Sequence, residues 1–241
     1  MSLVLNFSRN ISSGLFAVCM LAATGISAQT ADEIAGKYVE AIGGRDVIGK
    51  VTSLSMEGST SVMGNDAPTT VTVLNGKGYK NEMEFNGSKI IQSVNEKGGW
   101  AINPMSGADA QAMPDEAYKA GREQMFVGGP LFDYAAKGNT LTLQGKEDNS
   151  YKIAVVNKDK IESTYFIDTA TYLINKIVRK GMANGQETTI TIKYSNYKKT
   201  DKGLVVPYQA DIDLGQFQLT TVYSRVDVNK AVDPSVFVMP K

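Results

Sequence analysis

Two carboxylates near the end of the chain have the spacing that could support chemistry. Asp211 and Asp213 form an Asp-x-Asp pattern, and paired carboxylates can serve acid–base catalysis or bind a hard cation. Residues two apart on a strand share one face, and Ile212 and Leu214 would then occupy the opposite, apolar face. The pattern is typical of the solvated outer face of a strand, and a hydrolase that uses these carboxylates is the enzymatic alternative.

The composition excludes most other catalytic and metal-binding chemistries. The chain has 241 residues, with no histidine and one cysteine. It therefore lacks a Ser-His-Asp triad, a Cys-His pair, an imidazole or cysteine metal site and an internal disulfide. Ser195 and Lys198 form a Ser-x-x-Lys pattern, but they lie on a predicted strand, whereas the catalytic version begins a helix. Asp109, Asp115 and Glu116 lack the spacing of a calcium loop.

The net charge of the chain also indicates which kinds of partner it can bind. The chain carries 25 Lys and Arg residues against 25 Asp and Glu residues, so it lacks the basic excess that is typical of nucleic-acid binding. We therefore predict a protein that is not an enzyme, has no cofactor or metal, and does not bind nucleic acid.

Residues 1–28 have the pattern of a secretory signal peptide. Arg9 is the only charged residue among them, and an apolar run from Leu15 to Ile26 follows it. This run is too short to span a bilayer, and small residues then precede a cleavage point after Ala28. We expect this segment to be removed and the protein to be periplasmic.

Cleavage after Ala28 would leave residues 29–241 as the mature chain. No linker or low-complexity stretch divides these residues, so a single domain is expected, and we expect it to be a monomer. A chain of this size can bury a sufficient core without disulfides. Lipidation at Cys19 is the alternative to cleavage, but the apolar residues around Cys19 suit the core of a signal better than a tether.

Two segments show the spacing of amphipathic helices. Within residues 31–51, Ile34, Tyr38 and Ile42 recur on one helical face. Within residues 114–136, an early proline and a similar spacing of apolar residues predict a second helix.

Elsewhere apolar and polar residues alternate, which predicts strands. Asn75-Gly76 and Asn86-Gly87 are strong hairpin signals, and strands joined by such short turns must be antiparallel. Residues 103–112 are small and polar and interrupt the pattern, and a last short segment spans 235–238. The expected strands, about eleven or twelve in number, lie near 53–62, 69–74, 79–85, 89–94, 99–102, 140–144, 151–157, 162–168, 173–179, 188–197, 204–214 and 217–228.

One sheet of this many strands must curl or split. The two helical segments are the only elements that could cover its apolar concave face. The predicted fold is therefore α+β: an unclosed, strongly curved antiparallel half-barrel with helices over the concave face. Its interior is either packed solid or holds a cavity.

The methionine content favours a cavity, because methionine suits adaptable apolar binding surfaces, although it also fills gaps in ordinary cores. The methionines beyond residue 28 are Met56, Met63, Met83, Met105, Met113, Met125, Met182 and Met239. Trp100 is expected to face either the core or the cavity. The candidate residues for lining the cavity or its lid are Leu54, Met56, Val71, Tyr79, Met83, Phe85, Ile90, Trp100, Ile102, Met105, Tyr118, Arg122, Met125, Phe126, Leu131 and Phe132.

Three stretches of the chain resemble a known family. Residues 165–181, 190–212 and 232–240 are similar to the periplasmic lipoprotein-carrier superfamily of LolA-, LolB- and LppX-like proteins. Residues 41–58 resemble the Bacteroidetes-type branch of this superfamily, often labelled outer-membrane lipoprotein-sorting protein. The pattern is a strand that ends in aspartate, a turn with leucine, a basic strand, a tyrosine-rich strand and Gly-Leu-x-x-Pro; the matching residues are Asp168, Leu173, Lys176–Lys180, Tyr194, Tyr197, Gly203, Leu204 and Pro207.

The resemblance implies a half-barrel whose apolar cavity receives acyl chains. It implies a carrier of lipoprotein acyl chains or of another lipid in outer-membrane biogenesis, with membrane proteins of the envelope as partners. Arg122 is the candidate for the carriers' lid arginine, and residues 103–136 are predicted to form a mobile lid. The alternative is a non-enzymatic structural or protein-interaction module with the same fold and a filled interior.

Overall fold

The computed structural model describes residues 29–104, 107–183, 186–215 and 217–240. The predicted signal segment, Cys19 and Met105 lie outside the described residues. No helix in the described ranges is long and apolar enough to cross a membrane.

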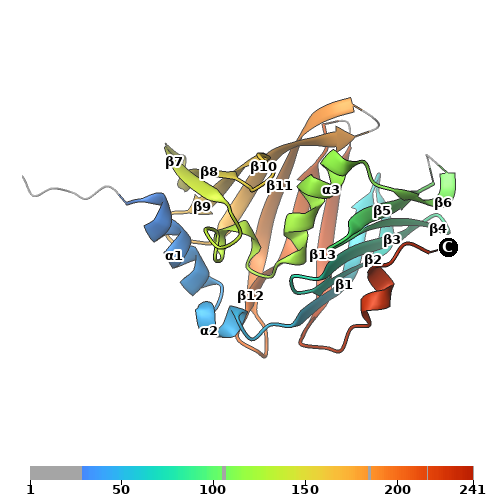
Figure 1. Cartoon of the computed structure of the whole chain (residues 1–241), viewed down its shortest axis with the longest axis horizontal. Helices are drawn as coiled ribbons and strands as arrows, with labels where there is room; N and C mark the ends of the chain where they lie inside the picture. Colours follow the sequence, from blue (N-terminus) through green and yellow to red (C-terminus); the bar gives the residue numbers. More distant parts are fainter. Residues whose placement is uncertain (1–28, 105–106, 184–185, 216, 241) are drawn as a thin grey trace, which may run out of the picture.

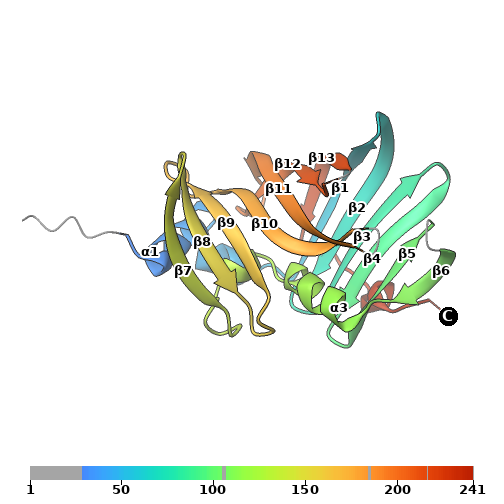
Figure 2. The same ribbon diagram turned by 90° about the horizontal axis from the view of Figure 1, so that it is seen from above.

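The described residues build one antiparallel sheet of thirteen strands. The order across the sheet is β6-β5-β4-β3-β2-β1-β13-β12-β11-β10-β9-β8-β7, so that β6 and β7 form its two edges and the sheet is unclosed. Figures 1 and 2 show its strong curvature. The strands are β1 (Ser53–Val62), β2 (Asn65–Leu74), β3 (Gly78–Phe85), β4 (Ser88–Asn95), β5 (Gly98–Asn103), β6 (Gly107–Ala112), β7 (Thr140–Glu147), β8 (Ser150–Val156), β9 (Glu162–Asp168), β10 (Ile174–Ala183), β11 (Gln186–Lys199), β12 (Val205–Asp213) and β13 (Gln218–Val228).

The strand count exceeds the prediction of about eleven or twelve, because none of the predicted ranges covers β6. Its sequence, Gly107–Ala112, consists of small and polar residues with little strand propensity. Backbone pairing with β5 nevertheless makes it an edge strand, in register at Trp100 opposite Ala112. The predicted turns Asn75-Gly76 and Asn86-Gly87 do join β2 to β3 and β3 to β4.

Helical segments occur where the sequence predicts them, but they are shorter. The predicted helix within 114–136 ends as an α-helix at Gly121 and continues only as short 3-10 turns. The helical elements are α1 (Ala31–Ala41), α2 (Arg45–Ile48), α3 (Asp115–Gly121), η1 (Arg122–Met125), η2 (Gly129–Leu131) and η3 (Pro234–Phe237). We call residues 115–131, which contain α3, η1 and η2, the helical insert. The last predicted segment, 235–238, therefore falls largely in the 3-10 turn η3.

The helical insert lies between the two halves of the sheet (Figure 2). α3 contacts β5 on one side and β10 on the other, while η1 contacts β2, β3 and β4. α1 packs near β7 and η2. A capping box between Thr30 and Glu33 begins α1, which satisfies backbone donors that the helix leaves free.

The strand registers divide the side chains into two faces. Leu54 lies opposite Val73 and Met56 opposite Val71, and these residues are buried on the inner face, towards the helical segments. The same core includes Ile34 and Tyr38 from α1. The main core thus lies inside the curve of the sheet.

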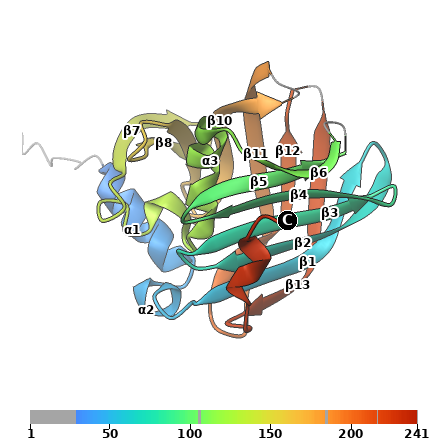
Figure 3. The same cartoon turned by 45° about the vertical axis from the view of Figure 1, so that its right-hand side comes forward.

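A smaller apolar contact covers the outer face of β3, β4 and β5. Phe237 of η3 is 1% exposed and packs against Gly78, where an added Cβ would lie 2.5 Å from its ring. The carbonyl of Phe237 accepts hydrogen bonds from Trp100 Nε1 at 2.9 Å and Asn95 Nδ2 at 3.0 Å. Figure 3 shows this C-terminal segment crossing the sheet. It holds Trp100 in a contact that sequence alone does not predict.

Candidate functional site

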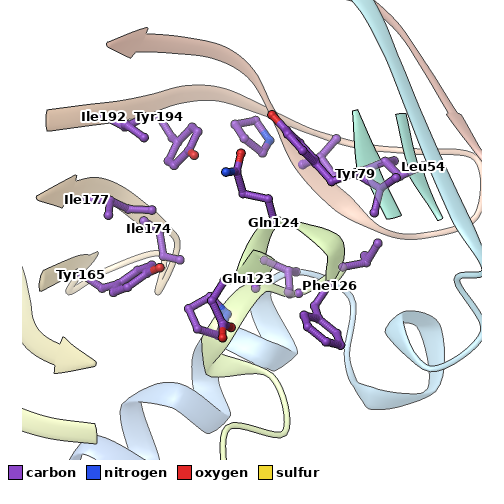
Figure 4. Close-up of a pocket in the computed structure, with 18 of the residues that line it drawn as sticks. Leu54, Tyr79, Glu123, Gln124, Phe126, Tyr165, Ile174, Ile177, Ile192 and Tyr194 are labelled. Carbon is purple, nitrogen blue, oxygen red and sulfur yellow. The ribbon is translucent and has the colours of Figure 1, made fainter. Parts of the chain in front are cut away.

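The inner face of the sheet and the helical segments enclose a cavity of about 340 Å³. This volume lies within the range of about 300–1,000 Å³ that is usual for small-molecule sites. Figure 4 shows side chains from the strands and from the helical insert directed into it. The cavity is thus formed by the same layers that form the core.

One part of the cavity is apolar. β1 contributes Leu54 and Met56, and β2 contributes Val71 and Val73. All four side chains are at most 8% exposed. Alternation along β1 and β2 places them together, because the intervening residues point to the other face. This part offers surface for an alkyl chain.

The remaining lining is rich in tyrosine and carries charge. Arg179 of β10 and Glu123 and Gln124 of the helical insert reach the cavity, with Asn157 and Ser163 nearby. Gln124 extends into the space between Tyr79 and Tyr194 (Figure 4). The tyrosines that line the cavity are Tyr38, Tyr79, Tyr165, Tyr194, Tyr197 and Tyr223.

Burial controls the ionisation of these tyrosines. It raises the pKa of Tyr38, Tyr79, Tyr165 and Tyr194, because a phenolate would lose its hydration inside the protein. The phenols are therefore protonated and able to donate hydrogen bonds. Tyr197 already donates one, to the carbonyl of Ile174 at 2.6 Å.

Polar contacts hold the helical insert over the cavity. Arg122 of η1 forms an ion pair with Asp159, which lies in the turn between β8 and β9. The carbonyl of Ala120 accepts a hydrogen bond from Arg179 Nη1 at 3.4 Å. At the other end, Tyr118 donates to the carbonyl of Asn95 at 3.0 Å. The insert is tied to both halves of the sheet.

Lys137 stabilises the loop that follows the insert. Its ammonium donates to the carbonyls of Gly129 at 2.8 Å and Phe132 at 2.7 Å, and lies 4.8 Å from the centre of the Phe126 ring. Burial lowers the pKa of Lys137 to about 8, and the nearby Glu123 carboxylate opposes that change. The charge of Glu123 is thus partly balanced by Lys137.

Several predicted residues meet at this cavity. Leu54, Met56, Val71, Tyr79 and Phe126 line it. Methionine does not concentrate here: Met56 is the methionine among the lining residues, whereas Met63 is 79% exposed. Among the described residues, tyrosine is the more characteristic lining residue.

Other predicted residues lie outside the lining. Met83, Phe85 and Ile90 occupy the inner-facing registers of β3 and β4, but towards the ends of these strands that lie away from Tyr79. Trp100 and Ile102 pair with Ser93 and Ile91 on the outer face, because β5 continues the alternation of β4. These five residues therefore do not line the cavity, contrary to the prediction.

The remaining predicted residues lie in or beside the helical insert and do not line the cavity. Met125 and Leu131 are buried in the packing of the insert, and Phe132 lies beside the main core. Tyr118 and Arg122 make the polar contacts described above. These residues therefore contribute to the packing and attachment of the helical insert that forms one wall of the cavity.

The sequence reasoning missed the lining residues that come from the second half of the sheet and two that come from the helical insert. The alternation of apolar and polar residues at Ile190, Ile192 and Tyr194 was a signal for an inner face. It did not show that this face meets the one formed by β1 and β2. The missed lining residues include Glu123, Gln124, Tyr165, Ile174, Ile177, Arg179, Ile192, Tyr194 and Tyr223.

Asp211 and Asp213 are far from this chemistry. They share the outer face of β12, while Ala210 and Ile212 occupy the inner registers. Thr220 Oγ1 donates to Asp211 at 2.8 Å. No group of three or more potential metal-binding side chains occurs within the described ranges.

Comparison with known proteins places the fold. No family model and no curated protein matches the sequence. An outer membrane lipoprotein-sorting protein domain from Vibrio parahaemolyticus has 14% identity and a TM-score of 0.54, over 86% of this chain and 95% of that chain. A LolA superfamily protein from Nitrosomonas europaea has 11% identity and a TM-score of 0.56, over 88% and 98%.

A third solved structure has a similarly low sequence identity and a similar TM-score. A DUF1329 family protein from Desulfovibrio piger has 12% identity and a TM-score of 0.57, over 88% of this chain and 98% of that chain. These likenesses extend over most of every chain compared. The chain therefore has the fold of the LolA superfamily and of outer membrane lipoprotein-sorting domains.

Proposed function

We propose that this protein is a carrier or binding protein for an acyl chain of a lipoprotein or of another lipid. The chain would lie in the cavity between the curved sheet and the helical insert. The cavity of about 340 Å³, with its apolar lining from β1 and β2, is the observation that carries this proposal. The likeness of fold to lipoprotein-sorting domains supports it.

The driving force would be the burial of methylene groups. Each buried methylene contributes about 0.8 kcal/mol, from which the costs of ordering the ligand and the protein must be subtracted. The helical insert would act as a lid, since it forms one wall and must move for a long chain to enter. Its polar contacts with β4, β10 and the β8–β9 turn would break and re-form with that movement.

The proposal includes a place of action and the absence of catalysis. With cleavage after Ala28, residues 29–241 would work as a single domain in the periplasm, where they would exchange lipid with membrane proteins of the envelope. Binding and release, without a covalent step, would then be the whole function. The outward direction of Asp211 and Asp213 agrees with that view.

Lipid analysis of the protein from its own envelope tests the proposal. The mature protein is purified without detergent, extracted with organic solvent, and the extract is analysed by mass spectrometry. A lipid at near one molecule per protein is the expected result. Protein that contains no lipid and binds no added dodecyl amphiphile would contradict the proposal and favour a module that acts through its surface.

A further inference from the structure

Arg179 is the cation that the cavity leaves without a charged partner. It lies half-buried on β10 and lines the cavity. Its one hydrogen bond within the described ranges is the long contact of 3.4 Å to the carbonyl of Ala120. None of the ion pairs among the described residues includes Arg179. A guanidinium has five N–H donors, so most of its capacity is unused.

The charged residues nearest to Arg179 along the helical insert interact with groups other than Arg179. Arg122 is paired with Asp159. Glu123, the acidic residue that lines the cavity, acts on the ammonium of Lys137, whose pKa it raises against the effect of burial. Arg179 is therefore the one cation among the described residues that line the cavity, which it shares with the Glu123 carboxylate, whose Oε2 is buried without a hydrogen bond.

Three phenols line the same cavity as Arg179. Burial raises the pKa of Tyr79, Tyr165 and Tyr194, and the positive charge of Arg179 lowers each pKa by a smaller amount. No hydrogen bond within the described part of the chain involves the hydroxyls of these three tyrosines. Tyr79 and Tyr194 point towards the cavity from opposite halves of the sheet (Figure 4). We call Arg179, Tyr79, Tyr165 and Tyr194 the donor cluster.

We infer that the ligand of this cavity is an amphiphile with an anionic headgroup, a carboxylate or a phosphate, which the donor cluster binds. The alkyl chain would extend along Leu54, Met56 and Val71. A guanidinium with several hydroxyl donors matches the acceptor oxygens of such a group, and charge-assisted hydrogen bonds are about twice as strong as neutral ones. This inference rests on the proposed function, because it assigns the headgroup of the same ligand.

Matched amphiphiles that differ only in the headgroup test the inference. Delipidated mature protein is titrated by calorimetry with dodecanoate, dodecyl phosphate and dodecanol, each below its aggregation limit. We expect the better of the two anions to bind at least about tenfold more tightly than dodecanol. The order of the two anions distinguishes a carboxylate from a phosphate source.

Variants then assign the preference to Arg179. Arg179→Met, which keeps an unbranched side chain but removes the guanidinium, should lose at least about tenfold in affinity for the preferred anion and leave dodecanol binding unchanged. Arg179→Lys should retain part of the preference. Arg225→Met removes an arginine from the outer face and should change neither affinity. Thermal unfolding of each variant confirms that it is folded.

The outcomes separate the two proposals. Dodecanol that binds as tightly as both anions would overturn the headgroup inference and leave the acyl-chain proposal in place. The same holds for an anion preference that survives in Arg179→Met. If none of the three amphiphiles binds, the acyl-chain proposal itself fails, and the headgroup inference fails with it.

Discussion

The guanidinium of Arg122 in η1 forms an ion pair with the carboxylate of Asp159 in the turn between β8 and β9, and both side chains are only 16% exposed. This ion pair attaches η1 of the helical insert to the β8–β9 turn, which belongs to the half of the sheet that contains β7 to β10. It is the one ion pair that Arg122 makes within the described ranges. The pair is thus the main electrostatic tie of the proposed lid.

Loss of Asp159 should loosen the lid. Asp159→Ala leaves a largely buried guanidinium without its anion, so the free energy of unfolding should fall by about 2 kcal/mol, less than for a fully buried pair. Hydrogen exchange of residues 115–131 should become faster. Urea unfolding and hydrogen-exchange mass spectrometry measure the two effects.

An exposed ion pair supplies the control for Asp159→Ala. Asp201 contacts Lys202 at 3.1 Å, and both side chains are more than half exposed. Asp201→Ala should cost at most about 0.5 kcal/mol and leave exchange in the insert unchanged. Equal effects of the two substitutions would show that the Arg122 pair does not hold the lid.

A larger side chain at the apolar end of the cavity should prevent lipid binding. Val71 lines the cavity and is 8% exposed, so Val71→Phe should occupy space that the alkyl chain needs. Affinity for dodecyl amphiphiles should fall at least about tenfold, with a stability loss of about 1–3 kcal/mol from overpacking. Calorimetry and urea unfolding measure these changes.

The same substitution on the other face of the sheet is the control. Val222 of β13 is 46% exposed and pairs with Ser59 on the outer face. Val222→Phe should leave both affinity and stability nearly unchanged. Unaltered binding by folded Val71→Phe would place the ligand outside this cavity.

The contact between Gly78 and Phe237 should tolerate no side chain at residue 78. A Cβ on Gly78 would lie 2.5 Å from the Phe237 ring, whereas one on Gly98 would meet nothing within 4 Å. Gly78→Ala should therefore cost about 1–3 kcal/mol in the free energy of unfolding, and Gly98→Ala should be nearly neutral. A Gly78→Ala protein as stable as Gly98→Ala would mean that the C-terminal segment does not pack there in solution.

Asp168 should contribute stability that depends on pH. The backbone N–H of Thr171, at 2.8 Å, and that of Ala170, at 3.1 Å, donate to its carboxylate and hold the pKa of Asp168 below its usual value. Because the folded-state pKa is lowered, this stabilisation is present above the unfolded-state pKa of about 3.9 and is lost as the pH falls through the folded-state pKa.

A comparison of variants across pH measures this contribution. Asp168→Ala should lower the free energy of unfolding by about 1 kcal/mol at pH 6, with a smaller difference from the unsubstituted protein at pH 3. Asp66, an exposed residue of β2, serves as the control, because Asp66→Ala should cause little change at either pH. A difference for Asp168→Ala that stays constant from pH 6 to pH 3 would contradict the assignment.

Local patterns in the sequence were sufficient for much of the fold. Alternation predicted most strands, and Asn75-Gly76 and Asn86-Gly87 predicted their hairpins, because these signals depend on residues close together in the chain. β6 was missed because its pairing with β5, and not the propensity of its small residues, makes it a strand. The length of the second helix was overestimated, since its last turns follow the packing of the insert between β-strands.

Local sequence patterns predicted only part of the candidate site. Leu54, Met56 and Val71 were predicted because the alternation along β1 and β2 marks one apolar face. Trp100 was expected at the core or the cavity, yet it packs beneath Phe237 on the outer face. An aromatic residue in a strand is buried by whichever layer covers its face, and the C-terminal segment that covers Trp100 is remote in the sequence.

The sequence by itself determined the elements: strands with one apolar face, tight antiparallel turns, helices too few to cover both faces, and no histidine for catalysis. The tertiary structure alone decided which inner faces meet and what stands between them. In the sequence, Arg179 is one of several cationic residues on a predicted basic strand. Within the described part of the chain, it becomes a cation without an ion-pair partner in a tyrosine-lined cavity because the curvature of thirteen strands brings β10 opposite β3, with the helical insert between them. Curvature and long-range packing arise from contacts between distant residues, which no local pattern encodes.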